Sequence, residues 1–302
     1  MPFYGIKMYF ISPVHIGKHG IGMEGSDIVI HSDTLYSIIF QMRVKMYGIA
    51  EQLPIKLTSA FPFVRDIYYL PKPCLKPPGF DKEEIRAEYA KTVKSTSFVS
   101  LDIFDKWIKG EEIDYKTLMK IGSLLSDNIK VDVRPRIAVD RLSSNTALYF
   151  GGGTIFKKGE AGLYFLIECG KDEYRMLKEI FTLLQEEGIG GEKSSGYGRF
   201  ETEFVENFKL PTVDDGNKYI TLSLYCPINK EEISGIALSY QLVKRTGWSI
   251  CEGKHVLQKR LLMFAEGSVF GRQVVGKIAN VSPDREGHPI YKYGKAFLVK
   301  AR

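Results

Sequence analysis

The feature that most limits how this chain can fold is a glycine-rich segment at residues 188–198, which reads GIGGEKSSGYG and holds five glycines in eleven residues. A helical stripe of apolar residues precedes it: Leu177, Ile180, Phe181 and Leu184. The residues that follow the segment include FETEF, which is typical of a strand. The expected order is therefore helix, glycine-rich loop, strand.

This order excludes two common phosphate-binding motifs. A P-loop follows a strand, precedes a helix and has Lys after its last glycine, whereas Tyr197 follows Gly196 here. A dinucleotide-binding fingerprint needs the same strand–loop–helix order. We therefore do not expect the segment to bind a nucleoside triphosphate or a dinucleotide.

The composition of the segment nevertheless suits a ligand that carries phosphates. Glycine permits positive φ and close approach of a ligand to the backbone amides, which can form a nest for anions. We expect a phosphodiester or an exposed RNA base to contact these residues: Gly190, Gly191, Glu192, Lys193, Ser194, Ser195, Gly196, Tyr197, Gly198 and Arg199. The alternative is a flexible loop in which Gly188 only ends the helix.

The remaining pattern favours an α+β fold. An alternating segment at 6–11 predicts a strand, and the helical stripe that follows can be capped by Ser32 or Asp33. Strands and helices mix without strict alternation, which argues against a doubly wound parallel sheet. The stretch 207–217 is the best linker, so we predict domains at 1–210 and 211–302. Strands are expected in the second domain at 219–225, 236–243, 259–264 and 296–300, with little helical signal.

Other residues are candidates for RNA contacts. His15, Gly17 and Lys18 follow the first strand, and Lys244 and Arg245 precede Gly247 and Trp248. A strand-end histidine is often only structural, and the second group can equally be a partly exposed strand end.

Three arginines form a further basic group. Arg134, Arg136 and Arg141 lie in an extended region at 129–149 that can form an exposed hairpin around a turn at 143–145. Their simpler role would be ion pairs with the neighbouring aspartates on a solvated hairpin face.

The composition narrows the class of protein. The chain carries 42 Lys and Arg against 36 Asp and Glu, a net charge of +6 that permits but does not require a nucleic-acid partner. Its four cysteines show no CxxC spacing, so we do not expect a zinc finger. No carboxylate spacing completes a metal site with His15, His19 and His31, and we expect neither a metal nor a cofactor. No apolar run is long enough for a membrane helix and no signal peptide is recognisable, so we expect a cytoplasmic protein without a membrane partner.

Several segments together resemble a known family. They are SPVHIG, SDTLYSIIF, LPKPCLKP, RIAVDRLSSNT, the glycine-rich GIGGEKSSGYGRF, KRTGW, MFAEGSVF and HPIYKYGKAF. With them the chain resembles the RAMP proteins of CRISPR systems, and more narrowly the family of the fourth Csm subunit of type III-A effector complexes. The resemblance spans residues 6–297.

The resemblance implies two ferredoxin-like, RRM-related modules with antiparallel sheets, the glycine-rich loop and a protruding β-hairpin, for which 134–149 is the candidate. It implies a non-catalytic subunit that holds the 5′ handle of the CRISPR RNA. The implied protein partners are the large polymerase/nuclease subunit and the backbone RAMP subunit. The hairpin would contact target RNA near the first guide–target step.

Two other functions stay open. Some RAMP proteins are endoribonucleases that process precursor CRISPR RNA, and in that case His15 would be the general acid/base. A protein–protein scaffold with incidental RNA contacts is the third reading.

Overall fold

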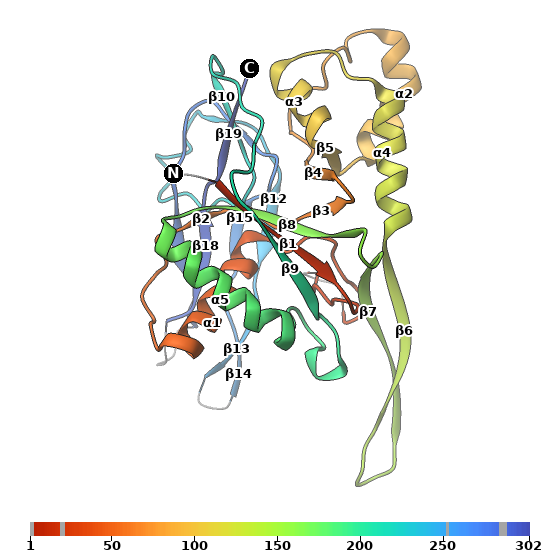
Figure 1. Cartoon of the computed structure of the whole chain (residues 1–302), viewed down its shortest axis with the longest axis vertical. Helices are drawn as coiled ribbons and strands as arrows, with labels where there is room; N and C mark the ends of the chain where they lie inside the picture. Colours follow the sequence, from red (N-terminus) through yellow and green to blue (C-terminus); the bar gives the residue numbers. More distant parts are fainter. Residues whose placement is uncertain (1–2, 19–21, 252–253, 284–288) are drawn as a thin grey trace.

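The computed structural model describes residues 3–18, 22–251, 254–283 and 289–302. Its centre is an antiparallel sheet with the order β5-β4-β3-β8-β1-β9, in which the short strand β2 also pairs with β8 (Figure 1). The strands span Phe3–Phe10 (β1), Lys56–Leu57 (β2), Phe61–Val64 (β3), Ile67–Pro71 (β4), Phe98–Ser100 (β5), Ala161–Glu168 (β8) and Phe200–Val205 (β9). The expected α+β class with antiparallel sheets is confirmed.

Two helices pack on one face of this sheet: α1 (Ser32–Tyr47) follows β1, and α5 (Lys171–Glu187) precedes β9. Apolar side chains of both helices, such as Ile39 and Phe181, join those of β1 and β8 in one core cluster. The chain order β1, α1, β3, β8, α5, β9 follows the β-α-β-β-α-β pattern of a ferredoxin-like module. This arrangement carries the glycine-rich loop between α5 and β9.

A long insertion separates β3 from β8. Besides β4 and β5 it contains α2 (Glu83–Ser95), α3 (Leu101–Lys109), α4 (Tyr115–Asn128), β6 (Ile129–Val139) and β7 (Thr146–Phe156). Ser100 caps α3 by accepting a hydrogen bond from the amide of Ile103, and Gly110 ends the helix with a φ of 74°. Phe104 and Trp107 of α3 are buried in a second cluster, on the sheet face opposite α1 and α5.

The β6–β7 hairpin projects away from the body of the molecule (Figure 1). It is longer than the predicted 134–149, because β7 continues through three glycines that let another segment approach: the amide of Gly152 donates to the carbonyl of Met23 at 2.8 Å. One face of the hairpin carries exposed apolar side chains: Val131, Val133, Ile137, Val139, Leu148 and Phe150. The other face carries Arg134 and Arg136.

The C-terminal half holds a second antiparallel sheet, β11-β16-β10-β19, and three two-stranded ribbons, β12–β15, β13–β14 and β17–β18. The strands span Lys218–Thr221 (β10), Ala237–Ser239 (β11), Leu242–Arg245 (β12), Trp248–Cys251 (β13), Lys254–Leu257 (β14), Leu261–Phe264 (β15), Val269–Phe270 (β16), Gly276–Asn280 (β17), Tyr291–Lys295 (β18) and Leu298–Ala301 (β19).

In the first sheet, the second, third, first and fourth strands of the β-α-β-β-α-β pattern lie side by side as β3, β8, β1 and β9. The second sheet has the same order, with β11, β16, β10 and β19. Over the described part of 218–302 there is no α-helix, so the helical layer expected of a second ferredoxin-like module is absent there. The β18 strand instead packs against α1 of the N-terminal half. Helix α1 therefore contacts both halves of the chain.

The two halves also share a hydrophobic core. One cluster joins Phe61 and Leu166 of the first sheet with Ile220, Val269 and Val299 of the second. The domain limits at residue 210 therefore stay a prediction, because no separation of cores marks them. None of the described helices is long and apolar enough to cross a lipid bilayer.

Candidate nucleic-acid interface

The glycine-rich loop is held against the segment that follows β1. The amide of Gly198 donates to the carbonyl of Pro13 at 2.7 Å, and that of Gly191 donates to the carbonyl of His15 at 2.9 Å. The amide of Gly196 donates to Lys193 within the turn at 3.0 Å. These three amides bind carbonyls of the chain, so the expected anion nest does not include them. The glycines instead fix the shape of the loop.

Two of the glycines allow a close approach of backbone segments. Gly190 has a φ of 86°, and a Cβ atom there would lie 2.5 Å from the carbonyl oxygen of His15. Gly198 has a φ of 82°, and a Cβ atom would lie 2.0 Å from the carbonyl oxygen of Ile189. A side chain would thus be strained by its backbone and blocked by another carbonyl.

The side chains of the loop bind the β6–β7 hairpin. Glu192 accepts a charged hydrogen bond from Arg136, whose guanidinium carbon lies 5.0 Å from the ring centroid of Tyr197. The same ring lies over Gly153 of β7, where a Cβ atom would come within 2.7 Å of it. Loop and hairpin therefore form one connected surface.

The other predicted arginines lie at the edges of this surface. Arg199 pairs with Glu186 at 2.8 Å, and Arg134 pairs with Asp132 at 2.6 Å. Arg141 is exposed at the tip of the hairpin. The pair between Arg134 and Asp132 is one of the ion pairs considered as the alternative role of the hairpin arginines. Contacts of these arginines with RNA stay a prediction.

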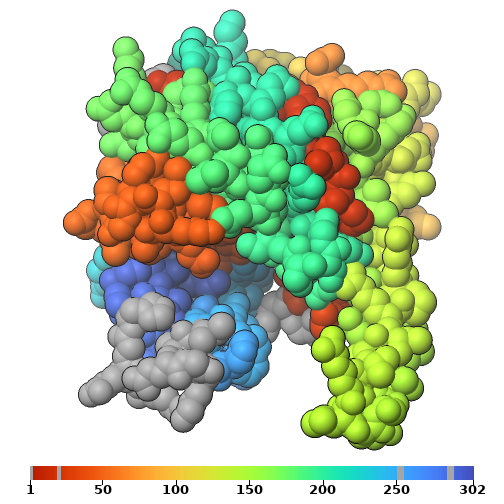
Figure 2. Space-filling model, turned by 60° about the horizontal axis from the view of Figure 1, so that its bottom comes forward, coloured from red at the N-terminus to blue at the C-terminus, as the bar shows by residue number. Residues whose placement is uncertain are grey.

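A cavity of about 610 Å³ opens where the loop meets the C-terminal half. It is lined by His15, Ile16, Gly17, Lys18, Ile30, His31, Thr34, Ser37, Ile38, Gln41, Gly190, Gly191, Arg245, Thr246, Gly247, Trp248 and Lys292. The lining contains three cations and, among the residues that the structure describes, neither Asp nor Glu. Figure 2 shows the green to teal loop region above a hollow between the yellow-green hairpin and the blue C-terminal segments.

A second cavity of about 400 Å³ continues the first along α1. The two share Ser37, Gln41, Trp248 and Lys292 as lining residues. We call the combined depression the α1 trough. Its floor is a helix that presents hydroxyl and amide groups, and its walls are the glycine-rich loop on one side and the β12–β13 connection on the other.

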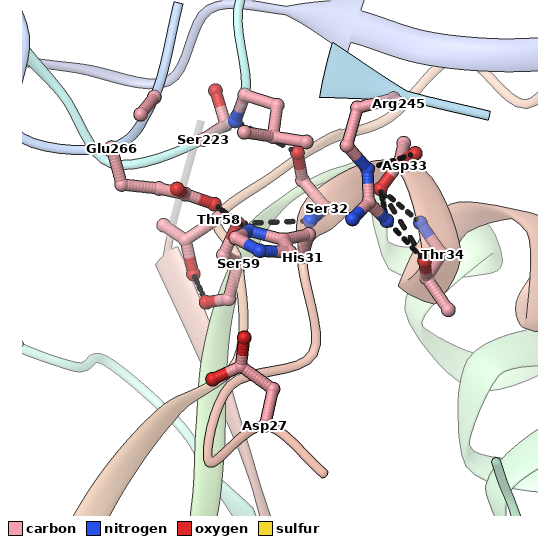
Figure 3. A network of polar contacts seen from close by, with 12 residues as sticks. Asp27, His31, Ser32, Asp33, Thr34, Thr58, Ser59, Ser223, Arg245 and Glu266 are labelled. Atoms are coloured by element: carbon pink, nitrogen blue, oxygen red, sulfur yellow. Dashed lines mark hydrogen bonds and ion pairs between the residues drawn. The ribbon is translucent and has the colours of Figure 1, made fainter. Parts of the chain in front are cut away.

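A buried ionic network joins α1 to residues of the C-terminal half that line the trough (Figure 3). Arg245 binds Asp33 through two hydrogen bonds of 3.0 and 2.8 Å and also donates to Thr34. Lys292 lies 3.3 Å from the same carboxylate, which is fully buried. Burial opposes the charge, but Arg245 and Lys292 together hold the pKa of Asp33 well below its usual range.

The first turn of α1 is not capped as predicted, because its polar side chains bind the C-terminal half. Neither Ser32 nor Asp33 is the N-cap; His31 is, without a side-chain cap. The Ser32 hydroxyl accepts from the amide of Leu224 at 3.0 Å, and Asp33 binds Arg245. Both side chains are used to attach the C-terminal half to the helix.

A second ion pair lies beside the first. His31 Nδ1 is 2.8 Å from Glu266 Oε1, and the same carboxylate accepts from Ser59 (Figure 3). Burial alone would lower the pKa of His31, but the charge of Glu266 and its hydrogen bond outweigh burial and raise it. The pKa of Glu266 is lowered despite its burial, mainly by the charge of His31.

This pair predicts a pH dependence of stability. Because the pKa of folded His31 is raised, its contribution is complete below the ordinary value of 6.5 and is lost as the pH rises through the raised value. Urea unfolding at pH values on both sides of neutrality should show a free energy of unfolding that falls with rising pH relative to a His31→Gln variant. An identical pH profile for the two proteins would contradict the pairing.

The structure brings six predicted residues together at the trough: His15, Gly17, Lys18, Gly190, Gly191 and Arg245. Lys193 lines a smaller neighbouring cavity of about 350 Å³ between α1 and α5. Lys244 is exposed and points away from the trough, because neighbouring strand residues face opposite sides. Lys292, Ser37 and Gln41 also line the trough but were not predicted, since nothing in the sequence shows that β18 packs on α1.

Known proteins match this chain over nearly its whole length. The model of the CRISPR Csm4 C-terminal domain matches residues 214–301. A Streptococcus thermophilus protein named CRISPR system Cms protein Csm4 is 25% identical over 97% of this chain and 98% of its own length. A protein of the same name from Thermococcus onnurineus (strain NA1) is 29% identical over 80% of this chain and 78% of its own length. Over most of its length the chain is thus similar to Csm4 proteins.

Solved structures of Csm4-containing complexes share the fold of this chain. A crystal structure of a Csm1–Csm4 cassette in complex with cA4 matches with a TM-score of 0.70 at 21% identity, over 100% of this chain and 98% of the other. A Csm3–Csm4 subcomplex of the type III-A CRISPR-Cas interference complex matches with a TM-score of 0.66 at 20% identity, over 100% of both chains. At these identities the match establishes the architecture.

The described residues contain no group of three or more His, Cys, Asp or Glu side chains positioned to hold a metal ion.

Proposed function

We propose that this chain is the non-catalytic subunit of a type III-A effector complex that holds the 5′ handle of the CRISPR RNA in the α1 trough. The observation that carries the proposal is that both halves of the chain contribute to one depression. Cations from both halves, Lys18 and Lys292, line it together with the glycine-rich loop, and its lining residues include no carboxylate among those the structure describes. A polyanion would therefore be attracted to it.

The lining chemistry favours RNA in single-stranded form. Thr34, Ser37, Gln41 and Thr246 offer hydroxyl and amide groups for 2′-hydroxyls and base edges. A depression of this kind, walled on two sides, admits an extended strand more readily than a duplex. Arg245 and Lys292 share the single carboxylate of Asp33, so the three groups together keep one positive charge beside the strand.

We further propose that the chain docks the large polymerase/nuclease subunit, Csm1, and the backbone subunit, Csm3. Support comes from the solved assemblies, in which Csm4 proteins of the same fold occur with Csm1 and with Csm3. Further support comes from the β6–β7 hairpin, whose exposed apolar side chains lie together on one face. Apolar side chains that are grouped in this way, unlike single scattered ones, mark a surface that contacts another protein. The basic face of the same hairpin would lie toward target RNA near the first guide–target step.

The proposal predicts that Lys18→Ala weakens RNA binding. Lys18 is exposed at the mouth of the trough, so its loss removes a phosphate contact without disturbing packing. We expect affinity to fall for all RNA sequences alike, and the slope of log affinity against log salt to decrease by about 1. Handle-RNA affinity would be measured on the assembled complex across a salt series.

Lys230→Ala is the matched control, because Lys230 is also exposed but lines neither cavity of the trough. It should leave both the affinity and the salt slope unchanged. Equal effects of the two variants would mean that only the overall charge matters, and the trough would not be the binding site.

The endoribonuclease alternative is favoured by one observation: His15 lines the trough, with Nδ1 2.8 Å from the carbonyl oxygen of Gly152. Since a carbonyl only accepts, Nδ1 carries the hydrogen and Nε2 is left for other chemistry. Purified chain incubated with precursor RNA in the absence of divalent metal ions separates the two functions. We expect no specific cleavage; cleavage that disappears in His15→Ala would establish the enzyme instead.

A further inference from the structure

Trp248 is placed unusually for a tryptophan. The chain has two tryptophans. Trp107 is packed in the core at 3% exposure, whereas Trp248 is 67% exposed at the start of β13. A large aromatic ring left open to solvent is a marker of contact with another molecule when it lies in a depression rather than alone on a convex surface.

The surroundings of Trp248 are those of a strand-binding groove. It lines both cavities of the α1 trough, and so do Ser37, Gln41 and Lys292. The ring therefore stands where a chain that follows α1 would pass from the first cavity into the second. Lys292 supplies a positive charge beside the ring, and Ser37 and Gln41 supply neutral hydrogen-bonding groups.

The backbone around Trp248 is fixed before any ligand arrives. The amide of Gln258 donates to the carbonyl of Gly247 at 2.9 Å, and the Gln258 side chain donates to the hydroxyl of Ser249 at 2.8 Å. Trp248 itself pairs with Leu257 across the β13–β14 ribbon. Because both neighbours of Trp248 are held by one residue, little ordering of this backbone is needed on binding.

We propose that Trp248 stacks on one unpaired base of the RNA in the α1 trough, while Lys18 and Lys292 contact the phosphates on either side of it. The proposal rests on the proposed function and assigns to this residue the contact that holds a base. Stacking on an indole is tolerant of base identity because every base has a π face. Trp248 would accordingly set affinity and register of the strand, and edge contacts elsewhere would read its sequence.

The test uses the two tryptophans as internal reporters. The full chain is titrated with an unstructured single-stranded oligoribonucleotide while tryptophan emission is recorded. We expect strong quenching in the wild type and in Trp107→Phe, where Trp248 is the remaining tryptophan, and little quenching in Trp248→Phe. Quenching retained in Trp248→Phe would overturn the proposal, since the signal would then come from the buried ring.

Affinity provides the second measurement. Trp248→Leu should weaken binding about five- to hundredfold, the usual range for loss of one base–aromatic stack, and Trp248→Phe should weaken it less. An abasic position moved along the oligonucleotide should weaken wild-type binding at one site and have no further effect there in Trp248→Leu. Normal affinity of Trp248→Leu overturns the stacking alone, whereas failure of the wild-type chain to bind any RNA overturns the proposed function with it.

Discussion

Replacement of Asp33 by alanine is expected to lower the free energy of unfolding by about 3–5 kcal/mol, the usual cost of breaking a buried ion pair by removing one partner. The carboxylate is fully buried, and both Arg245 and Lys292 depend on it. Without it, two cations are left side by side at the junction of the two halves. Urea or thermal unfolding of the full chain measures the loss directly.

The matched control is Arg134→Ala, which removes an exposed ion pair with Asp132 on the hairpin. Exposed pairs contribute little, so the free energy of unfolding should be almost unchanged. A small loss in Asp33→Ala, comparable to that of the control, would show that the junction does not depend on this network. The stabilisation by Asp33 should also persist into acid, because its pKa is held well below the ordinary value of 3.8 and its contribution disappears only as the pH falls through the lowered value.

Gly198→Ala is expected to disrupt the glycine-rich loop and to destabilise the chain by about 2–5 kcal/mol, the sum of left-handed backbone strain and overpacking. The new Cβ atom would lie 2.0 Å from the carbonyl oxygen of Ile189, a backbone atom that cannot move away without displacing the end of α5. RNA binding should be lost together with the loop contact to Pro13.

Gly196→Ala separates the effect of backbone strain from the effect of a steric clash at the new Cβ atom. Gly196 has a φ of 83°, almost the same as Gly198, but a Cβ atom there has no other atom within 4 Å. Only backbone strain remains, so the expected cost is about 1–2 kcal/mol and RNA binding should persist. Equal effects of the two variants on stability and binding would contradict the role given to close backbone approach.

Local patterns predicted the elements around the site well. The stripes of α1 and α5 and the alternation of β1 depend on residues close in sequence, and the helix–loop–strand order of 177–205 followed from the same kind of signal. The hairpin was predicted too short because Gly151 to Gly153 weaken the strand pattern; their role, the approach of the Met23 segment, depends on tertiary structure.

The C-terminal half shows where local patterns fail. The predicted strand at 236–243 is two strands, β11 and β12, that belong to different sheets. The predicted strand at 219–225 ends at Thr221, whose hydroxyl donates to the carbonyl of Ser223 at 2.8 Å and interrupts the extended pairing. Irregular strands of this kind are set by packing against the other half rather than by their own alternation.

Only those residues of the candidate site that carry a local signal in the sequence were predicted. Glycine chemistry marked Gly190 and Gly191, and proximity in sequence marked His15 and Lys18. Arg245 was selected for its charge, yet its structural role as the partner of buried Asp33 could not be foreseen, because the two residues are 212 positions apart. Long-range ion pairs leave no trace in a single sequence.

Photocrosslinking of the assembled complex tests directly whether RNA lies in the α1 trough. A photoreactive nucleotide would be placed at successive positions of the CRISPR RNA handle, and the crosslinked peptides of this chain identified by mass spectrometry. RNA bound in the α1 trough should crosslink to residues 13–18, 190–199 and 245–248. Crosslinks confined to the α2–α4 insertion or to the β11-β16-β10-β19 sheet would contradict it.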